Sequence, residues 1–149
     1  WARSRGLGDV YKRQVFKMLR ITRLTDYGFV LLGHIASCDQ NELHNSKDLS
    51  SILCIPWPTV SKVVKSLVQA GLLDSHQGSQ GGYKLSKSSD DISAADIIEI
   101  LEGPVSLTAC CVENGCDLNC SVSKSWQEVN TIIVNKLKSV SLTDMLKSK

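Results

Sequence analysis

A pair of prolines, Pro56 and Pro58, constrains the fold of this chain more than any other feature. Proline ends a helix that precedes it and is well tolerated in the first turn of a helix that follows it. Residues 46–53 before the pair place their apolar side chains on one face of a short helix. Residues 59–70 after it alternate a face of valines and leucine with a polar and basic face. Two helices joined by so short a turn are typical of a helix-turn-helix.

The segment after Gly71 predicts a β-hairpin. Residues 72–76 and 83–86 fit two short strands, and three glycines between them allow positive φ and close backbone approach. A hairpin directly after a helix-turn-helix is a wing, so we expect a mainly α fold with a small β-hairpin wing. The residues expected to contact double-stranded DNA lie on the polar face of the second helix and at the wing tip: Thr59, Ser61, Lys62, Lys65, Gln77, Ser79 and Gln80.

Two further helices flank this motif. Residues 25–36 fit a first helix capped by Thr25, and Ser93 with Asp96 forms a capping-box start for a helix that ends at Gly103-Pro104. His34 is expected to be a packed residue of the first helix, and Cys38 and Cys54, near helix ends, are expected to be buried structural residues.

The C-terminal part predicts a long helix with a seam close to a heptad pattern. Its apolar residues recur at steps of three and four: Val122, Trp126, Val129, Ile133, Leu137 and Val140. Because the earlier elements already close a core, we favour a dimerisation helix over one that packs on its own domain. The expected layout is a winged helix-turn-helix domain at 18–103, a cysteine-rich loop at 104–120, and a dimerisation helix with its tail at 121–149.

Residues 1–17 are expected to be a non-native extension, because they show no apolar period and Met18 suits a natural start; a real basic arm is the alternative. They hold five basic residues and one acidic residue, so without them the net charge falls from +2 to −2. Overall basicity is therefore no argument for DNA binding. No apolar run is long enough to cross a membrane, and we expect a cytoplasmic protein with no membrane partner.

Four of the six cysteines fall within eleven residues: Cys110, Cys111, Cys116 and Cys120. In a cytoplasmic chain such a cluster indicates metal or redox chemistry, and thiolates bind zinc and iron–sulfur clusters. Adjacent cysteines point in different directions, so we count three ligands, one of them from the first pair. A closed zinc site needs four ligands, so an iron–sulfur cluster with an exchangeable fourth ligand is favoured. An oxidation-prone loop with one disulfide is the alternative.

Several stretches together resemble the Rrf-two family of winged-helix transcription regulators, the group of IscR, NsrR and the SUF-operon regulators. They are MLRITRLTDYG at 18–28, PTVSKVVKSLVQAGLL at 58–73, QGGYKLS at 80–86, ISAADIIEILEGPVSLTACC at 92–111 and CSVSKSW at 120–126. SLTACCVENGC and SLTDML are most similar to the SUF branch. The resemblance implies a homodimer that binds a DNA operator and an iron–sulfur cluster, 2Fe-2S or 4Fe-4S, whose state tunes DNA affinity.

The resemblance also implies the ligand set. Cys110, Cys116 and Cys120 are the expected ligands, with Cys111 as the alternative to Cys110. Asp26 matches the position from which one branch supplies an acidic fourth ligand from the partner subunit.

Three positions depart from the family pattern. Ser123 replaces the histidine that follows the last cysteine in IscR-type proteins, and Gln77 and Gln80 replace basic residues of the wing, which weakens phosphate contacts. We expect a repressor of iron–sulfur assembly genes. The alternatives are a nitric-oxide or redox sensor of the same fold and a zinc- or disulfide-stabilised interaction module. No nucleophile–base motif or phosphate loop indicates an enzyme.

Overall fold

The computed structural model describes residues 21–108, 111 and 120–147. These residues divide into two compact units, one of residues 21–104 and 134–147 and the other of 105–108, 111 and 120–133. The expectations for residues 1–17, Cys110 and Cys116 lie outside the described residues. Among the described residues, no helix is long and apolar enough to span a membrane.

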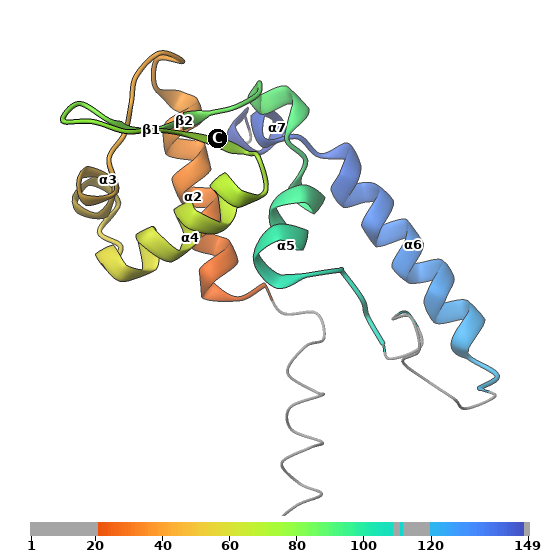
Figure 1. The fold of residues 1–149 in the computed structure, drawn as a ribbon. Coiled ribbons are helices and arrows are strands. Elements are labelled where there is room, and N and C mark those ends of the chain that lie inside the picture. The colour runs from red at the N-terminus through yellow and green to blue at the C-terminus, as the bar shows by residue number, and fades with distance from the viewer. Residues whose placement is uncertain (1–20, 109–110, 112–119, 148–149) are drawn as a thin grey trace, which may run out of the picture. The chain divides into compact units, whose positions relative to one another are not determined.

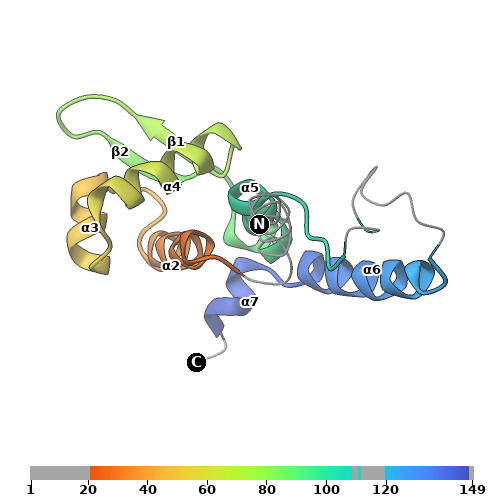
Figure 2. The same cartoon turned by 90° about the horizontal axis from the view of Figure 1, so that it is seen from below.

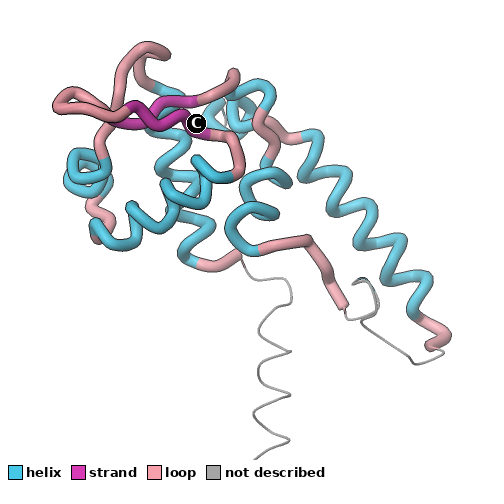
Figure 3. Tube along the Cα trace, viewed as in Figure 1, coloured by secondary structure: helices cyan, strands magenta, loops and turns pink. Residues whose placement is uncertain are grey.

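The first unit is mainly helical with one two-stranded sheet (Figures 1 and 3). Its elements are α2 (Arg23–Ser37), α3 (Ser46–Leu53), α4 (Trp57–Gln69), β1 (Leu73–His76), β2 (Gly82–Leu85), the short 3₁₀ helix η2 (Ser89–Asp91), α5 (Ala94–Glu102) and α7 (Leu142–Lys147). Helix α6 (Ser123–Ser139) runs from the second unit into the first.

The core of the first unit lies where α2 packs against α4 and α5. Leu32 of α2, Leu67 of α4 and Ile97 of α5 are completely buried. Gly28 lies buried at the contact of α2 with α5, and a Cβ there would overlap the Leu101 side chain. The apolar side chains that drive this packing therefore also fix the position of α4, whose other face remains exposed.

Helix α2 begins two residues earlier than the sequence predicts. Thr22 is the N-cap, and its hydroxyl accepts a hydrogen bond from the backbone N–H of Thr25 at 3.4 Å. Thr25 is instead completely buried inside the helix, so the prediction that it caps the helix is wrong. The capping box of α5 is confirmed, with Ser93 and Asp96 exchanging hydrogen bonds of 3.0 and 3.1 Å.

The wing is confirmed to within one residue at each end. Strands β1 and β2 pair antiparallel from Leu73↔Leu85 to His76↔Gly82 (Figure 2). His44 extends this sheet, because its N–H and C=O form hydrogen bonds of 3.0 and 2.8 Å with Tyr83. A Cβ at Gly82 would lie 2.9 Å from the His44 backbone, so glycine is required for this approach.

In the second unit, Asn130 of α6 holds the segment that leads into the cysteine region. Its Oδ1 accepts a hydrogen bond from the Leu107 N–H at 2.9 Å, and its Nδ2 donates to the Val105 carbonyl at 3.3 Å. Helix α6 has no buried residue along its described length. The side chains of Trp126 and Val129 are 45% and 41% exposed, which is unusual for large apolar groups on one helix.

Candidate DNA interface and cysteine region

Helix α4 separates a buried face from a polar face. Its buried residues are Val60, Val63, Val64 and Leu67. On the other side Lys62 and Lys65 are exposed, while Thr59 and Ser61 are half-buried. No acidic residue occurs in α4, so the exposed face offers cations and hydroxyls to a polyanion.

The start of α4 is held by a contact that sequence reasoning missed. Trp57 is the first residue of α4 and its Nε1 donates a hydrogen bond to Ser46 Oγ at 3.0 Å. Lys47 Nζ lies 5.6 Å from the centroid of the Trp57 ring, within cation–π range. The Trp57 side chain is 50% exposed, so the surface beside the start of α4 presents an aromatic ring and a cation. The only sign of this contact in the sequence was an aromatic residue between two prolines.

The turn before α4 contains Cys54, which adopts the left-handed conformation at φ +54° and is exposed. The expectation that Cys54 is buried is therefore wrong, because the turn directs its side chain to solvent. Cys38, at the end of α2, is only half-buried, and its Sγ lies 3.9 Å from His34 Nε2.

The wing tip is exposed but not basic. Gln77, Ser79 and Gln80 all lie at the surface between β1 and β2. The nearest wing lysine is Lys84, half-buried on β2. Contacts from the tip to DNA would therefore be hydrogen bonds between neutral groups, which contribute little to salt-dependent affinity.

Two of the clustered cysteines lie among the described residues, and both are free thiols. Cys120 is exposed. The Cys111 thiol is half-buried, lies 3.3 Å from Thr108 Oγ1 and donates to the Trp126 carbonyl at 3.7 Å. Cys111 is thus directed towards α6.

Two carboxylates, those of Asp26 and Glu102, lie at the start of α2. Asp26, the predicted fourth ligand, is exposed in the first turn. The Thr22 N–H donates to the carboxylate of Glu102 at the end of α5. Partial burial raises the pKa of Glu102, but hydrogen bonds from Thr22 and from the Thr25 side chain together outweigh burial, so the pKa lies below its ordinary value.

The comparisons with known proteins agree with this geometry. A family model described as Rrf2, Iron-dependent Transcriptional regulator, matches residues 21–148. The chain belongs to the Rrf2 family. Among curated Rrf2-family relatives, the regulator NsrR of Halalkalibacterium halodurans is 27% identical over 132 residues, covering 86% of this chain and 90% of NsrR. Protein rrf2 of Nitratidesulfovibrio vulgaris is 26% identical over 132 residues, covering 87% and 88%.

Solved structures of the Rrf2 group share the fold. The chain is similar to IscR of T. potens, with 30% identity and a TM-score of 0.68 over 87% of each chain. It is also similar to CymR of B. subtilis, the global cysteine regulator, with 26% identity and a TM-score of 0.74 over 89% of this chain and 99% of CymR. This Rrf2-family chain is therefore a winged-helix, DNA-binding transcription regulator and not an enzyme.

Proposed function

We propose that this Rrf2-family chain is an iron–sulfur-dependent repressor of cluster-assembly genes and that it binds its operator as a homodimer. The observation that carries the proposal is the set of four cysteines within the eleven residues 110–120. The family to which the chain belongs is described as iron-dependent, and this thiol-rich segment directly precedes α6.

The donor chemistry of the described residues fits a cluster. Cys120 is a free, exposed thiol that needs no rearrangement of a core to bind iron. The contacts of Cys111 with Thr108 and the Trp126 carbonyl support Cys110 as the ligand of the adjacent pair. The cluster would then be held by Cys110, Cys116 and Cys120, with Asp26 of the partner subunit as the fourth ligand. When bound, such a cluster supplies a centre that responds to oxidants, to nitric oxide or to iron supply.

Two residues, Asn130 and Asp26, would link the state of the cluster to the position of the DNA-binding helix. Asn130 holds residues 105–107 against α6, so the entrance to the cysteine segment has a fixed support. Asp26 lies in the first turn of α2, the helix that packs on α4. A bond to Asp26 would therefore restrain a helix in contact with the DNA-binding helix.

The exposed apolar side chains of α6 support dimerisation through this helix. Trp126 and Val129 belong to the seam read from the sequence, and both are more than a third exposed in the single chain. Burial of such side chains against a second copy is favourable because it removes apolar surface from water.

The test is anaerobic reconstitution with iron and sulfide, followed by visible absorption and operator binding. We expect the parent to bind a chromophore and Cys116→Ala to lose it. Cys111→Ala should keep it, since that thiol bonds within the protein, and Cys110→Ala should lose it. Asp26→Ala should keep a cluster of altered spectrum or oxygen lability.

Two results would contradict the proposal. A parent protein that takes up no iron and sulfide would exclude cluster binding, and operator affinity that is equal with and without the cluster would exclude cluster-dependent regulation. A chromophore that survives Cys110→Ala but not Cys111→Ala would assign the first ligand to Cys111.

A further inference from the structure

We propose that His34, Cys38 and His44 form a second metal site, for a zinc-class divalent cation, inside the winged-helix unit. Each side chain offers one ligand atom, and the three atoms lie within 4.8 Å of one another. Cys38 Sγ and His34 Nε2 are 3.9 Å apart. Nitrogen and sulfur ligands of one tetrahedral zinc ion lie about 3.3–3.6 Å apart, as bond lengths of roughly 2.0–2.3 Å require. The ligand atoms would have to approach each other to this separation for a metal ion to bind all three.

The three ligands come from segments that the fold already holds in place. His34 lies in the last turn of α2, and Cys38 caps the end of that helix four residues later, so both project on the same side. His44 lies in the next turn, where both of its backbone groups pair with Tyr83 of the wing. The imidazole rings of His34 and His44 meet edge to face, with centroids 5.7 Å apart.

The second observation is a buried nitrogen. The His44 side chain is only 6% exposed, and its Nε2 is buried with no hydrogen-bond partner among the described residues. Buried polar atoms are nearly always paired, because an unpaired one has lost its water without replacement. A thiol–imidazole hydrogen bond would account for Cys38 and His34 alone. A metal ion bound by all three side chains would pair the buried imidazole of His44 as well.

The donor set selects the class of metal. Two imidazoles and one thiolate suit zinc and similar transition ions, whereas magnesium and calcium require oxygen ligands. Binding breaks the S–H bond of Cys38, forms a sulfur–metal bond and releases the proton to solvent. Three protein ligands leave one coordination position for water or a small solute.

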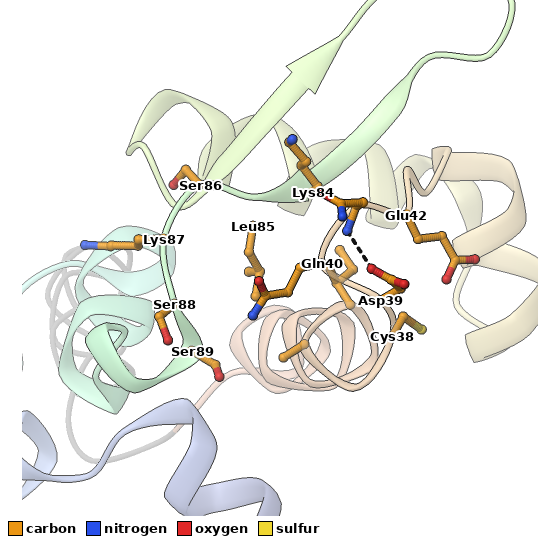
Figure 4. Close-up of a pocket in the computed structure, with 13 residues that line it drawn as sticks. Cys38, Asp39, Gln40, Glu42, Lys84, Leu85, Ser86, Lys87, Ser88 and Ser89 are labelled. Carbon is orange, nitrogen blue, oxygen red and sulfur yellow. Dashed lines mark hydrogen bonds between the residues drawn. The ribbon is translucent and has the colours of Figure 1, made fainter.

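A cleft adjoins the site at Cys38. It has a volume of about 330 Å³ and its walls include Cys38, Asp39, Glu42 and Lys84. Figure 4 shows Cys38 beside Asp39, whose carboxylate accepts a hydrogen bond of 3.0 Å from the Asn41 N–H. Cys38 is half-buried at this cleft, so one ligand of the site lies near the surface.

The position of the site connects it with DNA binding. His44 directly precedes Asn45, the N-cap of α3, and is paired with β2 of the wing. A metal bound to His34, Cys38 and His44 would join the end of α2 to the start of the helix-turn-helix and, through the His44 backbone, to the wing. The site is therefore expected to order the two elements that are predicted to contact DNA.

The experiment uses cobalt(II) as the probe and the full-length chain with Cys110, Cys111, Cys116 and Cys120 replaced by serine. This background removes the clustered thiols, so that its result is independent of the iron–sulfur proposal. We expect one cobalt ion per chain, with visible ligand-field bands and a thiolate-to-cobalt charge-transfer band that zinc abolishes by displacement. Zinc should also raise the melting temperature of this background, because it binds the folded state.

The variants Cys38→Ser and His34→Gln should lose the charge-transfer band or weaken cobalt binding by at least about tenfold, since removal of an outer-shell partner alone costs that much. Both residues are only half-buried, so the test does not depend on the buried His44. The matched controls Cys54→Ser and His76→Gln replace exposed residues outside the site and should bind as the background does. The absence of a thiolate–cobalt band in the background, or equal binding by Cys38→Ser, would overturn the proposal.

Discussion

The indole of Trp57 donates a hydrogen bond to Ser46 Oγ at 3.0 Å, which joins the first residues of α4 and α3. The two helices of the helix-turn-helix are thus joined at their N-termini as well as through the turn between them. Pro56, the N-cap of α4, supplies no side-chain cap, so this contact is an additional restraint on the start of α4.

The first prediction concerns this contact. Trp57→Phe keeps an aromatic ring but removes the donor, and we expect it to lower the free energy of unfolding by about 0.5–1.5 kcal/mol, towards the low end because the bond is exposed. Ser46→Ala should cost a similar amount, and the double variant should cost less than the sum of the two. Urea unfolding of the four proteins measures this coupling. Strictly additive losses would show that the hydrogen bond stabilises nothing.

The second prediction concerns the exposed face of α4. Lys62→Ala should weaken operator binding by about 1–3 kcal/mol if Lys62 contacts a base. If it contacts phosphate only, all duplexes should lose affinity alike and the salt slope should fall by about one. Fluorescence anisotropy at several salt concentrations separates these outcomes, with Lys138→Ala on α6 as the control. Unchanged binding of every duplex would remove this face of α4 from the interface.

The third prediction concerns the seam of α6. The double variant Trp126→Asp, Ile133→Asp should be monomeric in analytical ultracentrifugation, because dimerisation would bury unpaired charges. Ile132→Asp is the matched control, since Ile132 is 68% exposed and lies off the heptad-like seam. A dimer that resists the double substitution, or one that only Ile132→Asp disrupts, would place the interface on another face.

The fourth prediction concerns pH. Because hydrogen bonding holds the pKa of Glu102 below its ordinary value, its carboxylate stabilises the fold above the ordinary carboxyl range, and this contribution is lost as the pH falls through the lowered pKa. Glu102→Gln should therefore be less stable than the parent at neutral pH, by less than about 1 kcal/mol because the group is exposed. The difference should vanish in acid.

Urea unfolding from neutral to acidic pH measures this difference, and Glu99→Gln, an exposed residue one turn earlier on α5, is the control. If Glu102→Gln lost the same stability at every pH, or if Glu99→Gln lost as much, the hydrogen bond from Thr22 would not be the cause of the stability difference.

The sequence predicted those features that depend on short-range rules. The hairpin, the capping box of α5 and the buried face of α4 follow from glycine placement, cap chemistry and helical periodicity. The start of α2 was missed because Thr22 and Thr25 both have side chains able to cap a helix. In the structure Thr22 is the cap. Thr25 is buried, and the Thr22 N–H bonds to Glu102, a residue distant in sequence, so neither feature could be seen in the local sequence.

The candidate sites also divide into those formed by neighbouring residues and those formed by residues distant in sequence. The exposed lysines of α4 and the cysteine cluster are visible in the sequence, because each is local. The group of His34, Cys38 and His44 is not, since the position of His44 depends on its pairing with Tyr83, thirty-nine residues later. Asn130 was also missed, because its partners at 105 and 107 belong to a segment without regular structure.

The missing side chain at Gly28 limits how α2 and α5 can move. A single added carbon would already overlap Leu101 Cδ1, so the two helices are in close contact at this point. The bond from Thr22 to Glu102 lies at the same end of the pair and opposes their separation there. Closer approach of the two helices here would require the Leu101 side chain to move, and their separation is opposed at one end. Towards its end at Cys38, α2 is held instead by α7, whose Leu146 side chain lies beside Gly33.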